Sequence, residues 1–514
     1  MEKNDKRIVK NTLYLYIRML VMMALSFFST RIVLNILGVS DFGVNNVVGG
    51  FVSMFTLLNS ILQTGTRRFL ALNLAKDNAF LLKRTFSTAF AIHCAIALLV
   101  VVLLETFGVW FLNTYLNIDP DRMRAANYVF QFSVVSLFLN ITQTPFIAAV
   151  TAHEKFNIYA YLSIYDVLAK LSVLYILYVS PGDKLIVYAA LIMGVNALTI
   201  MLYRFYCIRQ FAECKFSLTV DKVLFRQMCS FSGWSTLGHL SAVLNQQGTT
   251  VLLNIFFNTA VNAARGLAGT VLSVIEQFVM GFITASVPQL TKYYGAGEQE
   301  KFKRLIFNVS QYTLFLMSII AIPVLLEIDF VLQLWLGIVP DYTAVFIKIT
   351  IITYLIKYSN IMIDQGLTAI GKVKELSLIT APIYLLNVPL VYLALKIGFE
   401  PWSVYIVSMI SVLAGFIVNL ILLAKYADFP AGEYFVKIFM RNLVLVAISS
   451  ILPLYLHFIM PSGAIRFCVV CSVSILVTVI VVFYGGLNKE VQEAVKHKVI
   501  VTCEKICYRR TDDR

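Results

Sequence analysis

Charged residues are scarce in this chain of 514 residues. Asp, Glu, Lys and Arg together make 14% of the sequence, whereas soluble domains carry about 25%. Hydrophobic residues make 59%, and they gather in runs of about 20 residues or more, the length that crosses ~30 Å of hydrocarbon. This composition excludes an ordinary soluble protein and predicts an all-α, polytopic membrane protein.

Acidic residues are the scarcer of the two signs, 28 against 42 basic residues, and the net charge is +14. A basic balance can indicate nucleic-acid binding. Here, however, the basic residues lie between the apolar runs, as in loops held at a membrane surface. The sequence has no recognised nucleic-acid-binding motif. We therefore expect membrane lipids, and no nucleic acid, among the partners.

Histidine and cysteine are too scattered for a metal centre or a disulfide framework. The five histidines have no metal-ligand spacing. Cys468 and Cys471 form a CxxC, but it lies in an apolar run, where cysteine is usually an inert packing group. Enzymes embedded in a membrane usually need carboxylates or histidines on sizeable loops, and the loops expected here are short. We expect no enzyme activity, no cofactor and no metal.

The apolar runs predict fourteen membrane-spanning helices. Strands are not expected, because the runs lack the roughly ten-residue alternation of a membrane barrel. The expected spans are 12–37, 42–64, 87–108, 124–150, 158–180, 185–207, 232–257, 260–287, 306–328, 341–369, 376–397, 403–425, 438–459 and 465–485.

The basic residues between the spans predict the orientation. If the N-terminus faces the cytoplasm, nearly all of them fall on the cytoplasmic side, which is the positive-inside pattern. The opposite side keeps only Arg122, Arg124, Lys184, Lys396 and Arg466. We therefore expect both termini in the cytoplasm and short external turns, the first of them at 39–41.

The start of the chain recurs in its second half. Leu34-Asn35-Ile36 returns 219 residues later as Leu253-Asn254-Ile255. Six spans separate the copies, an even number, so both copies have the same orientation and form a parallel repeat. Function is expected first in the space between the two halves. The predicted parts are an N-terminal lobe at 1–215, a C-terminal lobe at 216–430, two extra spans within 431–485 and a basic cytoplasmic tail at 486–514.

Several ionisable residues lie within the expected spans. A charge at bilayer depth costs about 2.5–3.5 kcal/mol on insertion scales, so each one needs a reason. Arg binds phosphate through two parallel hydrogen bonds and Lys binds it as a point charge, so an excess of deep cations favours an anionic ligand. The deep cations are Arg18, Arg31, Lys170, Arg265, Lys348 and Lys357, and the deep acids are Asp166, Glu276 and Asp364.

Some of these charges have a structural alternative. Asp166 and Lys170 are four residues apart with the acid first, the favourable order for an ion pair on one helix, so a neutral structural pair and a functional role are both open. Arg18 and Arg31 lie about 140° apart around an ideal helix. We expect one of them to line a cavity and the other to reach the membrane surface.

Lys357 lies near the middle of its span, too deep to reach water easily. Asp364 lies on the same face about 10 Å away, and Asn360 between them completes a polar stripe. This stripe packs against a neighbouring helix or lines a cavity, and Asp364 holds Lys357 in place or carries a coupling proton. Lys348 lies roughly opposite Lys357 around the same helix, nearer the outer end.

Arg265 follows Ala263-Ala264 and precedes Gly266. Small residues let helices approach closely, which would hold its guanidinium toward protein. Under the repeat it stands where the first copy has Asn46. We interpret Arg18, Arg31, Arg265, Lys348 and Lys357 as substrate-binding cations of the cavity. The coupling or charge-partner candidates are Asp364, Glu276, Asp166 and Lys170.

The stretch from Leu37-Gly38 through Asp41-Phe42-Gly43 to Gly65-Thr66-Arg67-Arg68 resembles the start of Wzx-type polysaccharide flippases. These belong to the multidrug/oligosaccharidyl-lipid/polysaccharide (MOP) exporter superfamily. The expected span count, the two six-span lobes and the two extra C-terminal spans are also similar to that group. The resemblance covers nearly the whole chain.

This resemblance implies a V-shaped pair of lobes in the bacterial inner membrane. It implies translocation of an undecaprenyl-diphosphate-linked oligosaccharide from the inner to the outer leaflet, for O-antigen, capsule or exopolysaccharide, with a polysaccharide polymerase as a candidate partner. The family's cations in spans one and eight would correspond to Arg18 or Arg31 and to Arg265.

Two related functions are less favoured. No cation in span two matches the arginine of the lipid II flippases, and the arginine-rich opening of that group is absent, which disfavours lipid II as substrate. The alternative is a cation-coupled multidrug exporter of the same superfamily. Exporters that bind cationic drugs need an unpaired acid in the N-terminal lobe, and Asp166 does not supply one if Lys170 neutralises it.

Overall fold

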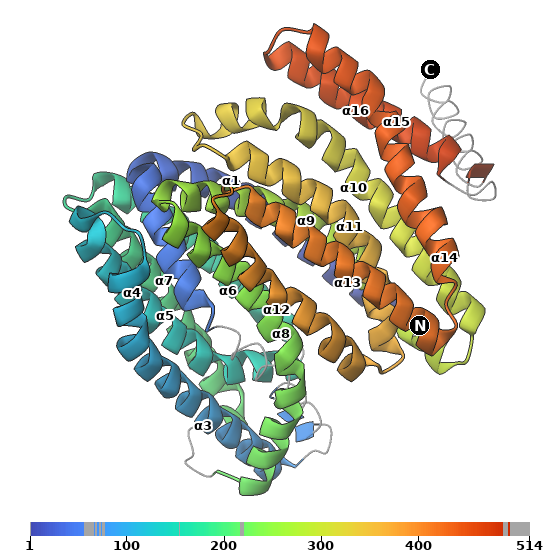
Figure 1. Cartoon of the computed structure of the whole chain (residues 1–514). Helices are drawn as coiled ribbons and strands as arrows, with labels where there is room; N and C mark the ends of the chain where they lie inside the picture. Colours follow the sequence, from blue (N-terminus) through green and yellow to red (C-terminus); the bar gives the residue numbers. More distant parts are fainter. Residues whose placement is uncertain are drawn as a thin grey trace, which may run out of the picture. The chain divides into compact units, whose positions relative to one another are not determined.

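A computed structural model shows a chain built from helices (Figure 1). It describes residues 2–55, 66, 69–70, 73–74, 78–153, 155–215, 220–486 and 492–493, with side chains described from Phe28 onward apart from some inner stretches. No strand occurs within these ranges. The predicted all-helical class is confirmed.

The described helical elements occur in the following order. They are α1 (Glu2–Ser53), α3 (Ala79–Leu103), the π-helical η1 (Leu104–Gly108), α4 (Val109–Tyr115), α5 (Pro120–Ala152), α6 (Phe156–Val179), α7 (Lys184–Gln210), the 3-10 turn η2 (Ala212–Cys214), α8 (Lys222–Phe256), α9 (Thr259–Gly295), α10 (Gln299–Leu336), α11 (Thr343–Ala369), α12 (Val373–Ile397), α13 (Ser403–Ala427), α14 (Ala431–Tyr434), the π-helical η3 (Phe435–Met440), α15 (Arg441–Ile459) and α16 (Ala464–Gly485).

Ten helical stretches in the described part of the chain are long and apolar enough to cross a membrane. Each predicted span overlaps one of the helices, and the predicted spans 12–37 and 42–64 both fall on α1 as far as it is described. The chain is therefore a polytopic membrane protein. The full count of fourteen spans stays a prediction.

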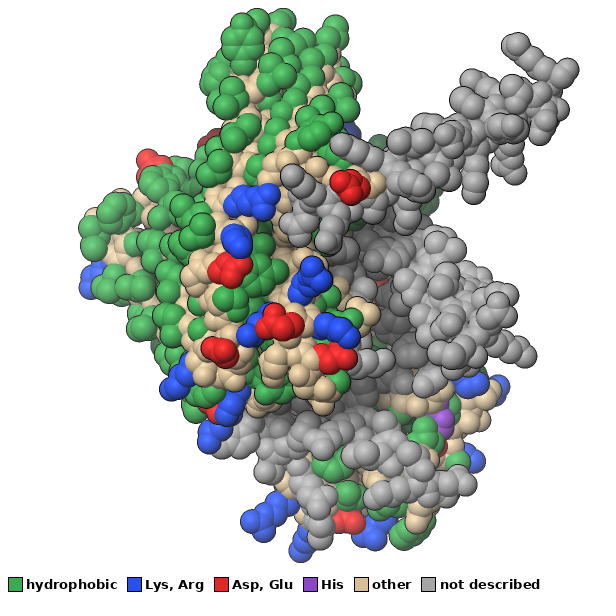
Figure 2. Space-filling view, turned by 90° about the vertical axis from the view of Figure 1, so that its right-hand side faces the viewer, with side chains coloured by type: hydrophobic (Ala, Val, Ile, Leu, Met, Phe, Trp, Pro, Cys, Tyr) green, Lys and Arg blue, Asp and Glu red, His purple; other side chains and the backbone are tan. Residues whose placement is uncertain are grey.

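Large apolar side chains are exposed along the helices, as expected for a protein surrounded by lipid. Hydrophobic side chains cover much of the face in Figure 2 that is not grey, and charged side chains of both signs gather in one part of it. On α15, for example, Ile451 and Phe458 are 65% and 77% exposed. In water such a surface would be unfavourable, whereas in a bilayer it is the contact surface.

The first two predicted spans are joined without a loop. Gly38 alone has a non-helical backbone, with φ 78° and ψ 172°, and α1 is helical on both sides of it. A positive φ is accessible to glycine without steric cost, so one residue is enough to bend the chain. The predicted turn at 39–41 is wrong, because these residues already belong to the second half of α1.

The chain forms two compact units that alternate along the sequence. The first consists of Met1–Val274, Trp335–Ile347 and Lys374–Ser411, and the second of Ile275–Leu334, Lys348–Val373 and Val412–Arg514. Helices α9, α11 and α13 each contribute to both units. The lobes predicted at 1–215 and 216–430 stay a prediction.

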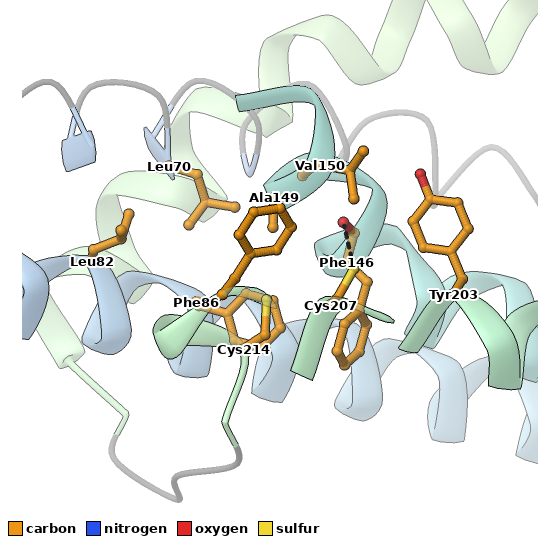
Figure 3. Close-up of a cluster of buried hydrophobic side chains, with 11 residues drawn as sticks. Leu70, Leu82, Phe86, Phe146, Ala149, Val150, Tyr203, Cys207 and Cys214 are labelled. Atoms are coloured by element: carbon orange, nitrogen blue, oxygen red, sulfur yellow. Dashed lines mark hydrogen bonds between the residues drawn. The ribbon is translucent and has the colours of Figure 1, made fainter. Parts of the chain in front are cut away.

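In the first unit, α5 packs against α1, α3 and α7. A buried cluster lies where α3, α5, α7 and η2 meet (Figure 3). Phe146 of α5 stands edge-on to Phe86 of α3, with ring centroids 5.1 Å apart, and the Cys207 thiol of α7 donates to the Phe146 carbonyl at 3.8 Å. Inside a bilayer such van der Waals and hydrogen-bond contacts hold helices together, since lipid is as apolar as the side chains.

In the second unit, α15 packs along α16, and Phe315 of α10 joins Leu445 and Val482 in a buried apolar cluster. A fully buried carboxylate links these helices. Glu327 of α10 accepts from His457 of α15 at 2.7 Å and from Arg466 of α16 at 3.1 Å. The two C-terminal helices are thus fastened to α10 by charge-assisted hydrogen bonds, which are stronger than neutral ones.

Candidate functional site

Arg265 is held in a fixed orientation near the start of α9. Its Nε donates to Thr250 at 2.8 Å, and its Nη2 donates to Thr249 at 2.6 Å and to the Gln246 carbonyl at 2.9 Å, all on α8. Its Nη1 donates to the Tyr405 hydroxyl of α13 at 3.2 Å. These partners are neutral, and no carboxylate pairs with Arg265 among the side chains that the structure describes. The guanidinium is therefore positioned while its positive charge stays uncompensated.

Small residues allow the helices around Arg265 to come close, as the sequence predicted. Ala263 and Ala264 are fully buried. A Cβ placed on Gly266 would lie 2.6 Å from the Asn46 side chain of α1. A Cβ placed on Gly43 would lie 1.9 Å from the Thr259 carbonyl oxygen. The second half of α1 and the first turns of α9 therefore meet backbone to backbone.

A second polar network lies in the same unit on α8, α12 and α13. Asn387 of α12 is fully buried, and its amide donates to Asn245 at 2.6 Å and to Ser408 at 3.3 Å. Ser411 donates to the side-chain oxygen Oδ1 of Asn387 at 3.1 Å. Asn245 belongs to the Asn245-Gln246-Gln247 run on α8, whose Gln246 carbonyl also accepts from Arg265. The run thus takes part in both networks.

Lys357 of α11 forms an ion pair in the second unit. Its Nζ donates to Glu276 of α9 at 2.5 Å, and Tyr354 donates to the other carboxylate oxygen at 3.3 Å. Both charged side chains are 37% exposed. Glu276, one of the predicted charge partners, therefore neutralises Lys357.

The predicted role of Asp364 in holding Lys357 is wrong. Two helical turns separate the residues, and Glu276 on the neighbouring helix is within reach of Lys357 instead. Asn360, between them, is buried and accepts from Asn419 of α13 at 3.2 Å. The middle of the predicted stripe therefore packs against a helix. The Asp364 carboxylate has no ion pair within the described residues.

The remaining predicted charges are found in separate places. Lys348 pairs with Asp329 at 2.7 Å in the second unit. In the first unit, Lys170 pairs with Asp166 at 2.7 Å, which confirms the ion pair expected from their spacing. Arg31 is exposed on α1. The Arg18 side chain lies outside the described side chains.

A group of three charges in the first unit was not predicted from the sequence. Arg122, at the start of α5, pairs with Asp41 at 2.5 Å and with Asp183 at 2.7 Å. Asp183 caps α7 by accepting from the Leu185 and Ile186 amides. Partial burial raises the pKa of Asp183, but the bonds from Arg122 and the Ile186 amide outweigh this and hold the pKa below its usual value. The sequence did contain a signal for these contacts: Asp41 follows the break at Gly38, and Asp183 directly precedes α7.

A neutral polar cavity of about 250 Å³ was also missed. It lies between α1, α5 and α7, with Gly49 and Ala189 on its walls and no ionisable group other than Tyr188 among its lining residues. Hydroxyl and amide groups of this kind bind neutral polar ligands by hydrogen bonds. The polar lining residues are Asn45, Ser53, Ser133, Ser136, Asn140 and Tyr188.

Comparison with known proteins identifies both family and fold. The family described as "Polysaccharide biosynthesis protein" matches residues 8–294, more than half of the chain. Comparison with curated proteins gave no match. Three solved structures, all at 14% identity or less, share the fold.

The structure titled "Lipid II flippase MurJ, inward closed conformation" matches with a TM-score of 0.71 and 14% identity, over 91% of this chain and 97% of that chain. A multidrug resistance MATE family transporter of the MOP superfamily in an inward-facing conformation matches with a TM-score of 0.65 and 14% identity, over 79% and 94%. A MOP superfamily transporter from Pyrococcus furiosus Vc1 matches with a TM-score of 0.58 and 12% identity, over 82% and 96%.

Proposed function

The chain belongs to the polysaccharide biosynthesis protein family, and from this premise we propose that it moves a lipid-diphosphate-linked oligosaccharide across the membrane. The family match over residues 8–294 carries the proposal. The fold is that of transporters of the MOP superfamily. A transporter, as the sequence analysis predicted, agrees with both findings, whereas an enzyme does not.

The substrate of this proposal is an undecaprenyl-diphosphate-linked oligosaccharide, carried from the inner to the outer leaflet of the bacterial inner membrane. The product serves O-antigen, capsule or exopolysaccharide synthesis, and a polysaccharide polymerase would receive it. We also propose that the chain crosses the membrane fourteen times, with both termini in the cytoplasm. The one-sided distribution of Lys and Arg supports that orientation.

Alternating access would occur between two six-span lobes, at 1–215 and 216–430. The contact between Ser40 and Thr259 supports the repeat. Their hydroxyl oxygens are 3.3 Å apart and the residues are 219 positions apart in the chain. This is also the offset between Leu34-Asn35-Ile36 and Leu253-Asn254-Ile255. Equivalent residues of two copies can touch only close to the axis that relates the copies.

Arg265 is our leading candidate for binding the diphosphate. Its orientation is fixed by neutral partners, so an anion gains a cation that need not be ordered first. Arg31 and Arg18 remain candidates for further contacts with the diphosphate, whereas Lys348 is paired with Asp329 and would act on the substrate only when that pair opens. Lys357 is neutralised by Glu276 in this structure, so it would act on the substrate only when that pair opens.

The sugar part of the substrate needs neutral hydrogen-bond partners. The cavity between α1, α5 and α7 offers hydroxyl and amide groups and two aromatic rings, those of Phe132 and Tyr188. We propose it as a contact surface for sugar hydroxyls. We also propose Asp364 as the coupling residue, because its carboxylate has no ion pair in the described part of the second unit.

Complementation of a deletion strain with no other flippase tests this function. We expect loss of surface polysaccharide in the deletion and recovery with the wild-type gene. Arg265→Gln should recover far less polysaccharide at equal protein abundance. The strain's sensitivity to cationic drugs should stay nearly unchanged. Normal polysaccharide together with drug hypersensitivity would contradict the proposal and favour the cation-coupled multidrug exporter.

A further inference from the structure

A basic cavity of about 530 Å³ lies within the second unit, and none of the charges considered so far lines it. One wall is formed by the first turns of α10, and the other by Pro430, α14, η3 and the first residue of α15. Five cations and two acids line it. They are Lys301, Lys303, Arg304, Lys437, Arg441, Glu300 and Glu433.

The acids of this cavity are already engaged. Glu433 accepts from Lys437 at 2.6 Å, and Glu300 lies 3.6 Å from Lys303. Two arginines keep their positive charge. Arg441 donates from Nε to the neutral Gly485 carbonyl at 3.0 Å, and Arg304 has no hydrogen bond or ion pair with the side chains that the structure describes. The cavity therefore carries an uncompensated positive charge from two guanidinium groups, with Asn308 and Gln311 beside them.

An apolar stripe begins next to these cations. Val436, Met440 and Val444 are 62%, 42% and 54% exposed, and their four-residue spacing places them along one side of η3 and α15. Lys437 and Arg441 form the adjacent row, again four residues apart. On the face drawn in Figure 2, charged side chains gather below a hydrophobic region of the surface. A ligand bound here would meet cations and an apolar surface side by side.

We propose that this cavity binds the phosphate headgroup of an anionic phospholipid, with the acyl chains along Val436, Met440 and Val444. Guanidinium groups bind phosphate through paired charge-assisted hydrogen bonds. A basic pocket between membrane helices is a suitable site for an anionic lipid headgroup. A free phosphate would use Arg304 and Arg441 but would gain nothing from the apolar stripe. The proposal does not depend on the transported substrate, because it concerns a bound lipid.

Native mass spectrometry of the full-length protein tests this inference. The protein is titrated with phosphatidylglycerol, with phosphatidylcholine and with inorganic phosphate. We expect retained phosphatidylglycerol and little retained phosphatidylcholine. Arg304→Gln with Arg441→Gln should lower the phosphatidylglycerol affinity about tenfold or more, because the double variant loses the charge-assisted hydrogen bonds to the phosphate, which contribute strongly to the binding free energy. Because Arg441 also contacts Gly485, Arg304→Gln alone serves as a second variant that leaves this contact intact.

The matched control is Arg209→Gln with Arg226→Gln. Both arginines are exposed, on α7 and α8, outside the cavity, and the double variant should bind phosphatidylglycerol like the wild type. Equal phosphatidylglycerol retention by wild type and both Arg304 variants would overturn the proposal. So would an inorganic phosphate affinity equal to that for phosphatidylglycerol, which would assign the cavity to a soluble anion.

Discussion

The hydroxyl oxygens of Ser40 and Thr259 lie 3.3 Å apart, although 219 residues separate them in the chain. Ser40 lies two residues after the Gly38 break in α1, and Thr259 is the first residue of α9. Around this contact the two helices are so close that Gly43 of α1 lies against the Thr259 backbone and Gly266 of α9 lies against the Asn46 side chain.

Gly43→Ala should lower the free energy of unfolding by about 1–3 kcal/mol, the usual range for overpacking. The new Cβ would lie 1.9 Å from the Thr259 carbonyl oxygen, and a backbone atom cannot move aside cheaply. The melting temperature of the purified protein measures the effect. Gly49→Ala on the same helix is the control, because nothing lies within 4 Å of its Cβ. Equal melting temperatures for both variants would refute the close contact.

Arg122→Gln should destabilise the first unit by about 1–3 kcal/mol, since it leaves Asp41 and Asp183 without their shared cation. Arg124→Gln is the matched control, because Arg124 is exposed and lies two residues further along the same helix. Thermal unfolding of both variants in one detergent gives the comparison. A loss that is equal in the two would mean that the three-charge group does not stabilise the fold.

Asp183→Asn should show a pH-dependent loss of stability. The pKa of Asp183 is lowered in the folded protein, so its contribution is complete above the unfolded pKa of about 3.9 and disappears as the pH falls through the folded value. The variant should therefore melt below wild type at about pH 6 and approach it near pH 3. A difference in melting temperature that stays constant over this range would count against the Arg122–Asp183 bond.

Arg265→Lys should retain more polysaccharide export than Arg265→Gln. Lysine keeps the charge but cannot reproduce the planar fork that contacts Thr249, Thr250 and Tyr405 together. We expect Arg265→Gln to lose about tenfold or more of the flipping rate in a reconstituted assay. If both variants flip at the wild-type rate, the diphosphate is bound elsewhere.

Lys357→Ala should reduce export more than Lys357→Arg, because arginine keeps a cation opposite Glu276. A double variant that also changes Glu276 separates two roles of Lys357. If Lys357 serves only as the structural partner of Glu276, Lys357→Ala with Glu276→Ala should restore the export that either single change removes. If Lys357 binds the substrate when the pair opens, the double variant should stay defective. Export at the wild-type level in every variant would remove Lys357 from the candidates.

Asp166→Asn with Lys170→Gln should leave export nearly unchanged. The two side chains pair with each other within one helix at 2.7 Å, so a neutral double variant leaves neither partner as an unpaired charge in the bilayer. Polysaccharide yield at matched protein abundance measures the effect. A severe loss of export would show that this pair takes part in transport.

The sequence predicted those features that depend on local spacing. Apolar runs located the helices, and the four-residue spacing of Asp166 and Lys170 located their ion pair. The small residues before Arg265 indicated a close helix contact. Each of these follows from the geometry of one helix, which the sequence contains directly.

Partners on different helices were not predictable in the same way. Lys357 was expected to interact with Asp364 in its own helix, but Glu276 is 81 residues away in sequence and 2.5 Å away in space. Arg122 likewise reaches Asp41 and Asp183 across helix ends. Such pairs depend on how helices rotate and cross, and a single sequence gives no direct measure of either.

Under the proposed duplication, the close approach of α1 and α9 has an evolutionary consequence. In a homodimer every substitution appears twice, and a residue beside the two-fold axis meets its own copy. In the single chain, Asn46 packs on Gly266 while its counterpart Arg265 carries the charge. A single duplicated chain can thus carry arginine in one copy and asparagine in the other, which two identical subunits cannot do.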